Sequence, residues 1–191
     1  MHHRHLLAAG LLSFAALGSA HAVNVTVVAG SGWKDFFVAD PAFNLGNTDF
    51  SWVDPNDFSN ISYSFTVADG FIGTLTVVDA GFSGDVFSVK SNGADLANTS
   101  AAVNSYPTAE GDYDFALANS NFGRGVYGFG AGAYTITGGL FASALDDTGG
   151  ALNSTVGALK LEIAPVPEAS TLAMLMAGLG LVGLLARRRA V

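Results

Sequence analysis

The stretch ISYSFTVADGFIGTLTV, residues 61–77, decides the fold class. Its first half, 61–67, alternates apolar residues with Ser and Thr, which is typical of a strand with one buried and one wet face. Asp69-Gly70 is a favoured tight-turn pair, and the alternation continues beyond it at Leu75 and Val77. We therefore predict two strands that pair with each other as a hairpin.

Similar patterns recur along the chain. Further strands are predicted at 23–28, 33–38, 85–90, 134–142 and 157–163, and Asn92-Gly93 marks another tight turn. The segment 112–122 differs, because Phe115, Ala118 and Phe122 have helical spacing and Asp112 can act as N-cap. We expect a helix of about two turns there, lying over an open end or face of the sheets. The predicted fold is all-β, a jelly-roll-like β-sandwich with one short helix.

The first 22 residues have the three parts of a secretory signal peptide. Arg4 and three histidines precede an apolar run from Leu6 to Leu17, and the small-residue pattern Ala20-His21-Ala22 follows. We predict a signal helix at 1–22, cleavage after Ala22 and export through the Sec pathway.

The remaining body, residues 23–164, contains neither histidine nor cysteine, since all four histidines lie in the signal peptide. Catalytic triads and the usual zinc ligands therefore cannot be assembled, so we expect no enzyme of those classes. The body carries four basic and fifteen acidic side chains, a net charge of −11. Such a surface repels phosphate backbones, so nucleic acid is not an expected partner.

The chain ends in an uncharged apolar segment, residues 171–186, followed by Arg187, Arg188 and Arg189. As a helix, sixteen residues span about 24 Å, which is short for a bilayer but workable with snorkelling flanks. We predict a transmembrane helix that anchors the body outside the inner membrane, with the arginines on the cytoplasmic side.

Three parts in a fixed order, Val166-Pro167-Glu168-Ala169-Ser170-Thr171, the apolar helix and the arginine cluster, resemble the PEP-CTERM sorting signal of Gram-negative surface proteins. The family's signature is Pro-Glu-Pro, and Ala169 stands where its second proline would be. The resemblance implies a transient inner-membrane anchor that an exosortase cuts near Pro167-Glu168. It also implies a final place at the cell surface or outside the cell, and a link to exopolysaccharide and biofilm. The predicted domains are thus 1–22, 23–164 and 165–191.

A second, weaker resemblance covers residues 75–138. This stretch is similar to a secreted bacterial and fungal β-sandwich module of unsettled function, and the matching positions are Asp79, Gly84-Asp85, Asn92-Gly93, Phe122, Arg124-Gly125 and the stretch 130–132. It implies the fold and no activity.

The sequence leaves three possible roles for binding or catalytic residues undecided. Paired carboxylates for glycoside hydrolysis would come from Glu110, Asp112, Asp114, Asp146 and Asp147. No cofactor is expected apart from calcium, whose candidate ligands are Asp54, Asn56 and Asp57, or Asp79 and Asp85. Aromatic side chains that could stack on sugars are Trp33, Trp52, Tyr106 and Tyr127.

The leading functional hypothesis is a non-enzymatic structural, adhesive or glycan-associated surface protein, with exosortase and exopolysaccharide as partners. The alternatives are a small carbohydrate-active enzyme with two carboxylates, and a lectin-like module that stays anchored in the membrane.

Overall fold

The computed structural model describes residues 22–43, 49–166, 174–182 and 187 of the chain. Its strands are β1 (Val23–Thr26), β2 (Lys34–Val38), β3 (Ile61–Val67), β4 (Phe71–Phe82), β5 (Val86–Ser91), β6 (Ala94–Asp95), β7 (Ala109–Glu110), β8 (Arg124–Phe129), β9 (Gly132–Ala142) and β10 (Thr155–Pro165). The body also has a 3-10 helix η1 (Pro41–Phe43) and an α-helix α1 (Tyr113–Ala118).

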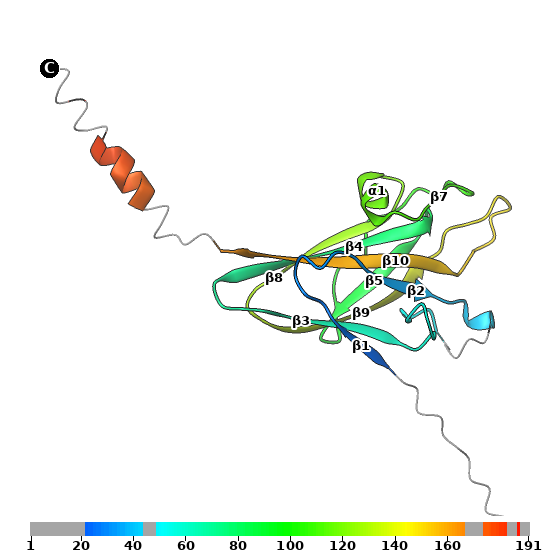
Figure 1. Ribbon diagram of the computed structural model, residues 1–191. Coiled ribbons are helices and arrows are strands. Elements are labelled where there is room, and N and C mark those ends of the chain that lie inside the picture. The colour runs from blue at the N-terminus through cyan, green and yellow to red at the C-terminus, as the bar shows by residue number, and fades with distance from the viewer. Residues whose placement is uncertain (1–21, 44–48, 167–173, 183–186, 188–191) are drawn as a thin grey trace, which may run out of the picture.

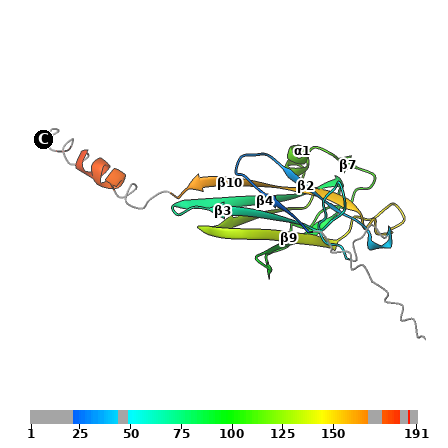
Figure 2. The ribbon, with the colours of Figure 1, turned by 60° about the horizontal axis from the view of Figure 1, so that its bottom comes forward.

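The strands form two sheets that pack face to face (Figure 1). The first sheet has the order β1-β3-β9-β5-β6, and the second has the order β2-β10-β4-β7, with β8 also paired to β4. β1 runs parallel to β3, and the other paired strands are antiparallel. Figure 2 shows β10 and β9 in separate layers, with α1 on the β10 side. The predicted β-sandwich with one short helix is confirmed, while a jelly-roll strand order stays a prediction.

Aromatic and aliphatic side chains fill the space between the sheets. Phe36 of β2 stacks on Trp52 with ring centroids 4.0 Å apart, and it meets Phe87 of β5 edge-on at 5.0 Å. Two glycines make room for these rings: a Cβ at Gly138 would lie 2.4 Å from Trp52 Cζ2, and one at Gly157 would lie 2.5 Å from Phe36 Cζ. The absence of a side chain at both positions is therefore a packing requirement.

The helix α1 covers part of the outer face of the second sheet. Asp112 is its N-cap and accepts the backbone N–H of Asp114 and Phe115 at 2.9 and 3.0 Å, as predicted. The helix is shorter than the predicted segment 112–122, because Asn119 has extended backbone angles and ends it. The chain then turns, which brings Phe122 under the helix in a second apolar cluster with Val78, Ala80, Ala116 and Ala158.

The predicted hairpin between residues 61–67 and 71–77 is wrong. β3 pairs with β1 and β9, whereas β4 pairs with β10, β7 and β8. Asp69-Gly70 thus carries the chain from one sheet to the other, and a Cβ on Gly73 would lie 2.8 Å from Val67 Cγ2 across the interior. Both strands bury their alternate side chains in one core, so the same pattern fits edge-to-edge pairing and face-to-face packing.

The other predicted strands are present, with ends that differ by a few residues. Asn92-Gly93 joins β5 to β6 as a two-residue loop in which both residues have positive φ, 49° and 81°. β8 was not predicted as a strand of its own, because a glycine-rich stretch is typical of a loop that connects two strands. Gly125 instead provides room for Tyr127, whose hydroxyl a Cβ there would approach to 2.3 Å.

Candidate functional site

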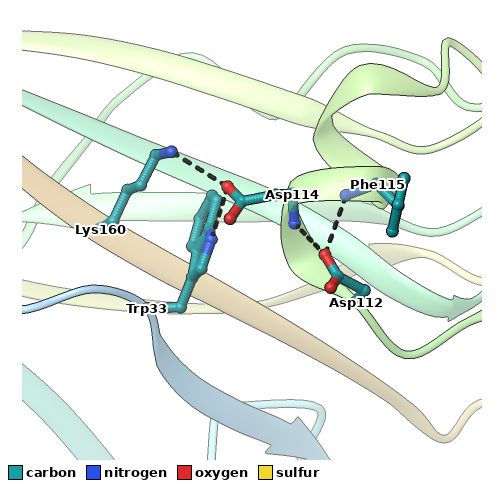
Figure 3. Close-up of polar contacts among 5 residues, drawn as sticks. All are labelled: Trp33, Asp112, Asp114, Phe115 and Lys160. Atoms are coloured by element: carbon teal, nitrogen blue, oxygen red, sulfur yellow. Dashed lines mark hydrogen bonds and ion pairs between the residues drawn. The ribbon is translucent and has the colours of Figure 1, made fainter.

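Trp33, Asp114 and Lys160 form a polar cluster that joins α1 to the second sheet (Figure 3). Trp33 Nε1 donates to Asp114 Oδ1 at 3.0 Å, and Lys160 Nζ lies 3.4 Å from the same oxygen. Lys160 Nζ also lies 4.5 Å from the centroid of the Trp33 ring, within cation–π range. The Trp33 donor, and then Lys160, lower the pKa of the Asp114 carboxyl. A hollow of about 220 Å³ lies beside this cluster.

Three of the other carboxylates that were candidates for catalysis, Glu110, Asp112 and Asp146, hold their own turns. Glu110 Oε1 accepts the N–H of Asp112 at 2.9 Å, and Asp112 itself caps α1. Asp146 Oδ1 accepts the Thr148 hydroxyl and the N–H groups of Thr148 and Gly150. The Thr148 hydroxyl, and then these N–H groups, lower the pKa of Asp146. This is the usual role of Asp at turns and helix starts.

The first calcium candidate, 54–57, is a hydrogen-bonded turn. Asp54 Oδ1 accepts the N–H and the side-chain amide of Asn56, both at 2.8 Å, and Asp57 Oδ1 accepts the N–H and hydroxyl of Ser59. Within the described residues there is no group of three or more His, Cys, Asp or Glu side chains that could hold a metal ion.

The second calcium candidate is a pair of buried acids. Asp79 on β4 is 0% exposed and Asp85, just before β5, is 2% exposed. Burial, and then the charge of Asp85, raise the pKa of Asp79 to about 9. Burial also raises the pKa of Asp85, and this effect exceeds the lowering by the Thr155 hydroxyl and the Ala144 N–H. The Ala144 N–H donates to Asp85 Oδ1 at 2.7 Å. The structure thus brings together the two acids that the sequence proposed.

Of the four aromatic candidates for sugar stacking, Trp52 is excluded, because it is 1% exposed inside the core. Tyr127 is partly buried, and its hydroxyl donates to Ala97 O at 2.8 Å. Burial raises the pKa of Tyr127 to about 12. Tyr106 is 36% exposed and packs on Phe82 with ring centroids 5.1 Å apart. Trp33 has Lys160 against its ring. A sugar-stacking role for these three residues stays a prediction.

Sequence reasoning missed a groove of about 520 Å³ in the first sheet. It lies between the segment 49–52, the start of β3 and the middle of β5 and β9, and its rim includes Phe50, Asn60, Ser88, Lys90 and Thr137. Phe50 is 37% exposed. The pair Gly138-Gly139 within a strand was the available signal, because adjacent glycines leave a strand without side chains to fill its face.

The tail follows directly from the last strand. The N–H of Val166 donates to Gly70 O at 2.8 Å, which holds the end of β10 beside the turn between β3 and β4. Residues 174–182 are helical, and their six large apolar side chains, from Met174 to Val182, are each more than half exposed. Among the described residues, no helix has both the length and the apolar character needed to cross a bilayer.

A family model of the PEP-CTERM protein-sorting motif matches residues 165–189. The chain carries a PEP-CTERM sorting signal. This signal implies an exported protein that is a substrate of an exosortase and is processed at a membrane. No curated protein matches the sequence. Among solved structures, the pre-peptidase C-terminal domain of a collagenase from Bacillus anthracis is similar, with 12% identity, a TM-score of 0.38, and coverage of 74% of this chain and 95% of that chain.

The PEP-CTERM signal confirms the family resemblance drawn from the tail, while its individual residues are only partly within the structure. Val166 and Arg187 are described, and Pro167, Glu168, Ala169, Ser170, Thr171, Arg188 and Arg189 lie outside the described residues. The same holds at the other end of the chain, where Ala22 is described and Ala20 is not. The signal helix and the full span 171–186 thus stay predictions.

Proposed function

We propose that the sandwich is a non-enzymatic component of the extracellular matrix that associates with the producer's own exopolysaccharide after sorting. The PEP-CTERM signal at 165–189 carries this proposal, since it implies an exported protein that an exosortase processes. The acidic body without histidine or cysteine supports it, because the common nucleophile and base pairs cannot form there.

The groove in the first sheet is the surface that fits a glycan best. It offers hydroxyl groups at Ser88 and Thr137, an amide at Asn60 and one partly exposed ring at Phe50. Sugars are bound by such combinations of hydrogen-bonding groups and a flat apolar face.

Sorting is tested first, by mass spectrometry of both ends of the protein from membrane and extracellular fractions of the native host. We expect an N-terminus at Val23 and a C-terminus near Pro167 outside the cell. An intact Val191 retained in the membrane would overturn the sorted, matrix-bound function and favour the anchored lectin-like alternative.

Glycan association is tested by affinity electrophoresis in gels that contain the host's purified exopolysaccharide. We expect retardation of the wild type and a weaker effect for Phe50→Ala and Asn60→Ala. Phe71→Ala is the matched control, because Phe71 is 39% exposed but lies on the other sheet. Unchanged mobility of the wild type would refute the proposal, and release of reducing sugar from the polysaccharide would favour the enzyme alternative.

A further inference from the structure

The buried pair of Asp79 and Asp85 is an anomaly for a folded interior. Both carboxyl oxygens of Asp79 are inaccessible to solvent, and neither has a hydrogen-bond partner. A buried carboxyl group without partners is destabilising, so its presence calls for a proton, a water molecule or a cation at that place.

The backbone holds the pair firmly in position. The N–H of Asp79 donates to Gly123 O at 2.8 Å, and Asp85 Oδ1 accepts the N–H of Ala144 at 2.7 Å. Four separate parts of the chain therefore meet here: β4, the loop before β5, the residue before β8 and the segment after β9. Neither acid lies in an exposed turn, so the loop-solvation role of the other Asp residues does not apply.

Burial and the charge of Asp85 disfavour a negative charge on Asp79 as long as no positive charge compensates it. The backbone amides of Gly84, Asp85 and Gly123 face its carboxyl group and favour the ionised form, although none completes a hydrogen bond. The charged side chain that acts on it is Asp85, which is also an acid. Three of the four basic side chains of the body have partners elsewhere: Lys90 pairs with Asp95, Lys160 pairs with Asp114, and the Arg124 guanidinium donates to Leu117 O. The fourth, Lys34, is not among the groups that act on Asp79.

Further oxygen atoms lie close to Gly84 and Gly123, the two glycines beside the pair. A Cβ on Gly123 would lie 2.5 Å from Asp85 O and 3.1 Å from Ser100 O, and one on Gly84 would lie 2.8 Å from Asn104 Oδ1. Asn104 Oδ1 already accepts the N–H of Leu145 at 2.6 Å. The residues beside the pair thus offer carboxylate and carbonyl oxygens, and the body has no histidine or cysteine that could supply a nitrogen or sulfur ligand. That irregular set suits Ca²⁺ better than Mg²⁺, which demands a regular octahedron.

We propose that Asp79 and Asp85 bind one Ca²⁺ ion within the sandwich, which ties β4 to the loop before β5. Ca²⁺ would supply the positive charge that the side chains around the pair do not provide. The proposal is independent of the matrix function, because it concerns the integrity of the fold and not the surface groove.

The test uses the exported protein, treated with a chelator and then titrated with CaCl₂. We expect one Ca²⁺ per chain by equilibrium dialysis, and a rise in Tm of at least about 5 °C at a hundredfold excess over Kd. Asp79→Asn and Asp85→Asn should each abolish both effects. Asp54→Asn and Asp146→Asn are matched controls, because they change acids in exposed turns and should keep the full shift.

Three outcomes would overturn the proposal. The first is wild-type protein that binds no Ca²⁺ and keeps its Tm, a measurement that requires no variant to fold. The second is Asp79→Asn with a Tm above that of the wild type and the same value in calcium and in chelator, which means that Asp79 holds a proton. The third is a calcium shift that survives in both pair variants and disappears in Asp54→Asn, which would place the ion in the exposed turn.

Discussion

Trp33 Nε1 donates a hydrogen bond to Asp114 Oδ1 across 3.0 Å, and this bond connects the loop before β2 to the first turn of α1. The two residues are 81 positions apart, so no local pattern in the sequence pairs them. Together with the burial of Ala116 against the sheet, the bond holds in place a six-residue helix that is too short to be stable alone.

Trp33→Phe should raise the pKa of Asp114 towards its ordinary value. The ring is retained but the donor is lost, and this donor is the largest cause of the lowered pKa. The measurement is a ¹³C NMR titration of the carboxyl groups. Asp146 is the internal control, because its low pKa comes from Thr148 and Gly150 and should not move. An unchanged pKa of Asp114 would mean that Lys160 alone sets it.

Asp112→Ala should reduce the free energy of unfolding by about 1 kcal/mol, a typical loss for an N-cap. Two N–H groups at the start of α1 lose their acceptor, and the helix no longer begins firmly over the Ala116 cluster. Urea unfolding monitored by circular dichroism measures the effect. Asp112→Asn is the matched control, since it keeps a side-chain acceptor and should remain close to the wild type. Equal loss in both variants would show that charge, and not capping, is what matters.

Gly138→Ala should destabilise the sandwich by roughly 1–3 kcal/mol, because the new methyl group overlaps Trp52 and the Ser88 carbonyl. Gly128→Ala is the control: Gly128 also lies in a strand, but a Cβ there meets nothing within 4 Å. Urea midpoints of the two variants give the comparison. Similar midpoints would mean that the Trp52 ring moves aside without cost.

The sequence predicted the layers of the fold better than their connections. Alternation at 61–67 and 71–77 identified two strands and their buried faces, and residues such as Phe65 and Val77 lie in the core as expected. It could not distinguish a hairpin from a crossover, because Asp69-Gly70 is compatible with both and the neighbours of each strand come from distant parts of the chain.

In the candidate sites too, local sequence patterns identified residues that lie close in the chain but not those that distant segments bring together. Asp79 and Asp85 are six residues apart and were proposed together, since a short loop between strands keeps its ends close. Trp52 was assigned to a possible sugar surface, although Gly138 makes room for it in the core from 86 residues away. The groove beside Phe50 depends on three separate strands and has only the Gly138-Gly139 pair as a local sign.

Alkaline pH should weaken the fold through its buried tyrosines, and Tyr127 is the most accessible test. Its pKa is raised to about 12 by burial, whereas an unfolded tyrosine ionises near 10. The folded state therefore holds this proton longer. Its contribution to stability is complete below pH 10 and is lost as the pH rises from 10 through 12.

Tyr127→Phe should have two effects of different sign on this profile. At pH 7 it loses the hydrogen bond to Ala97 O, which costs about 1 kcal/mol. Between pH 10 and 12 its free energy of unfolding should fall less steeply than that of the wild type, because one titrating hydroxyl is gone. Tyr63 and Tyr113, whose pKa values burial also raises, keep part of the slope. Urea unfolding at pH 7, 10 and 11.5 separates the two effects. Parallel profiles for both proteins would show that Tyr127 ionises in the folded state as it does in the unfolded chain.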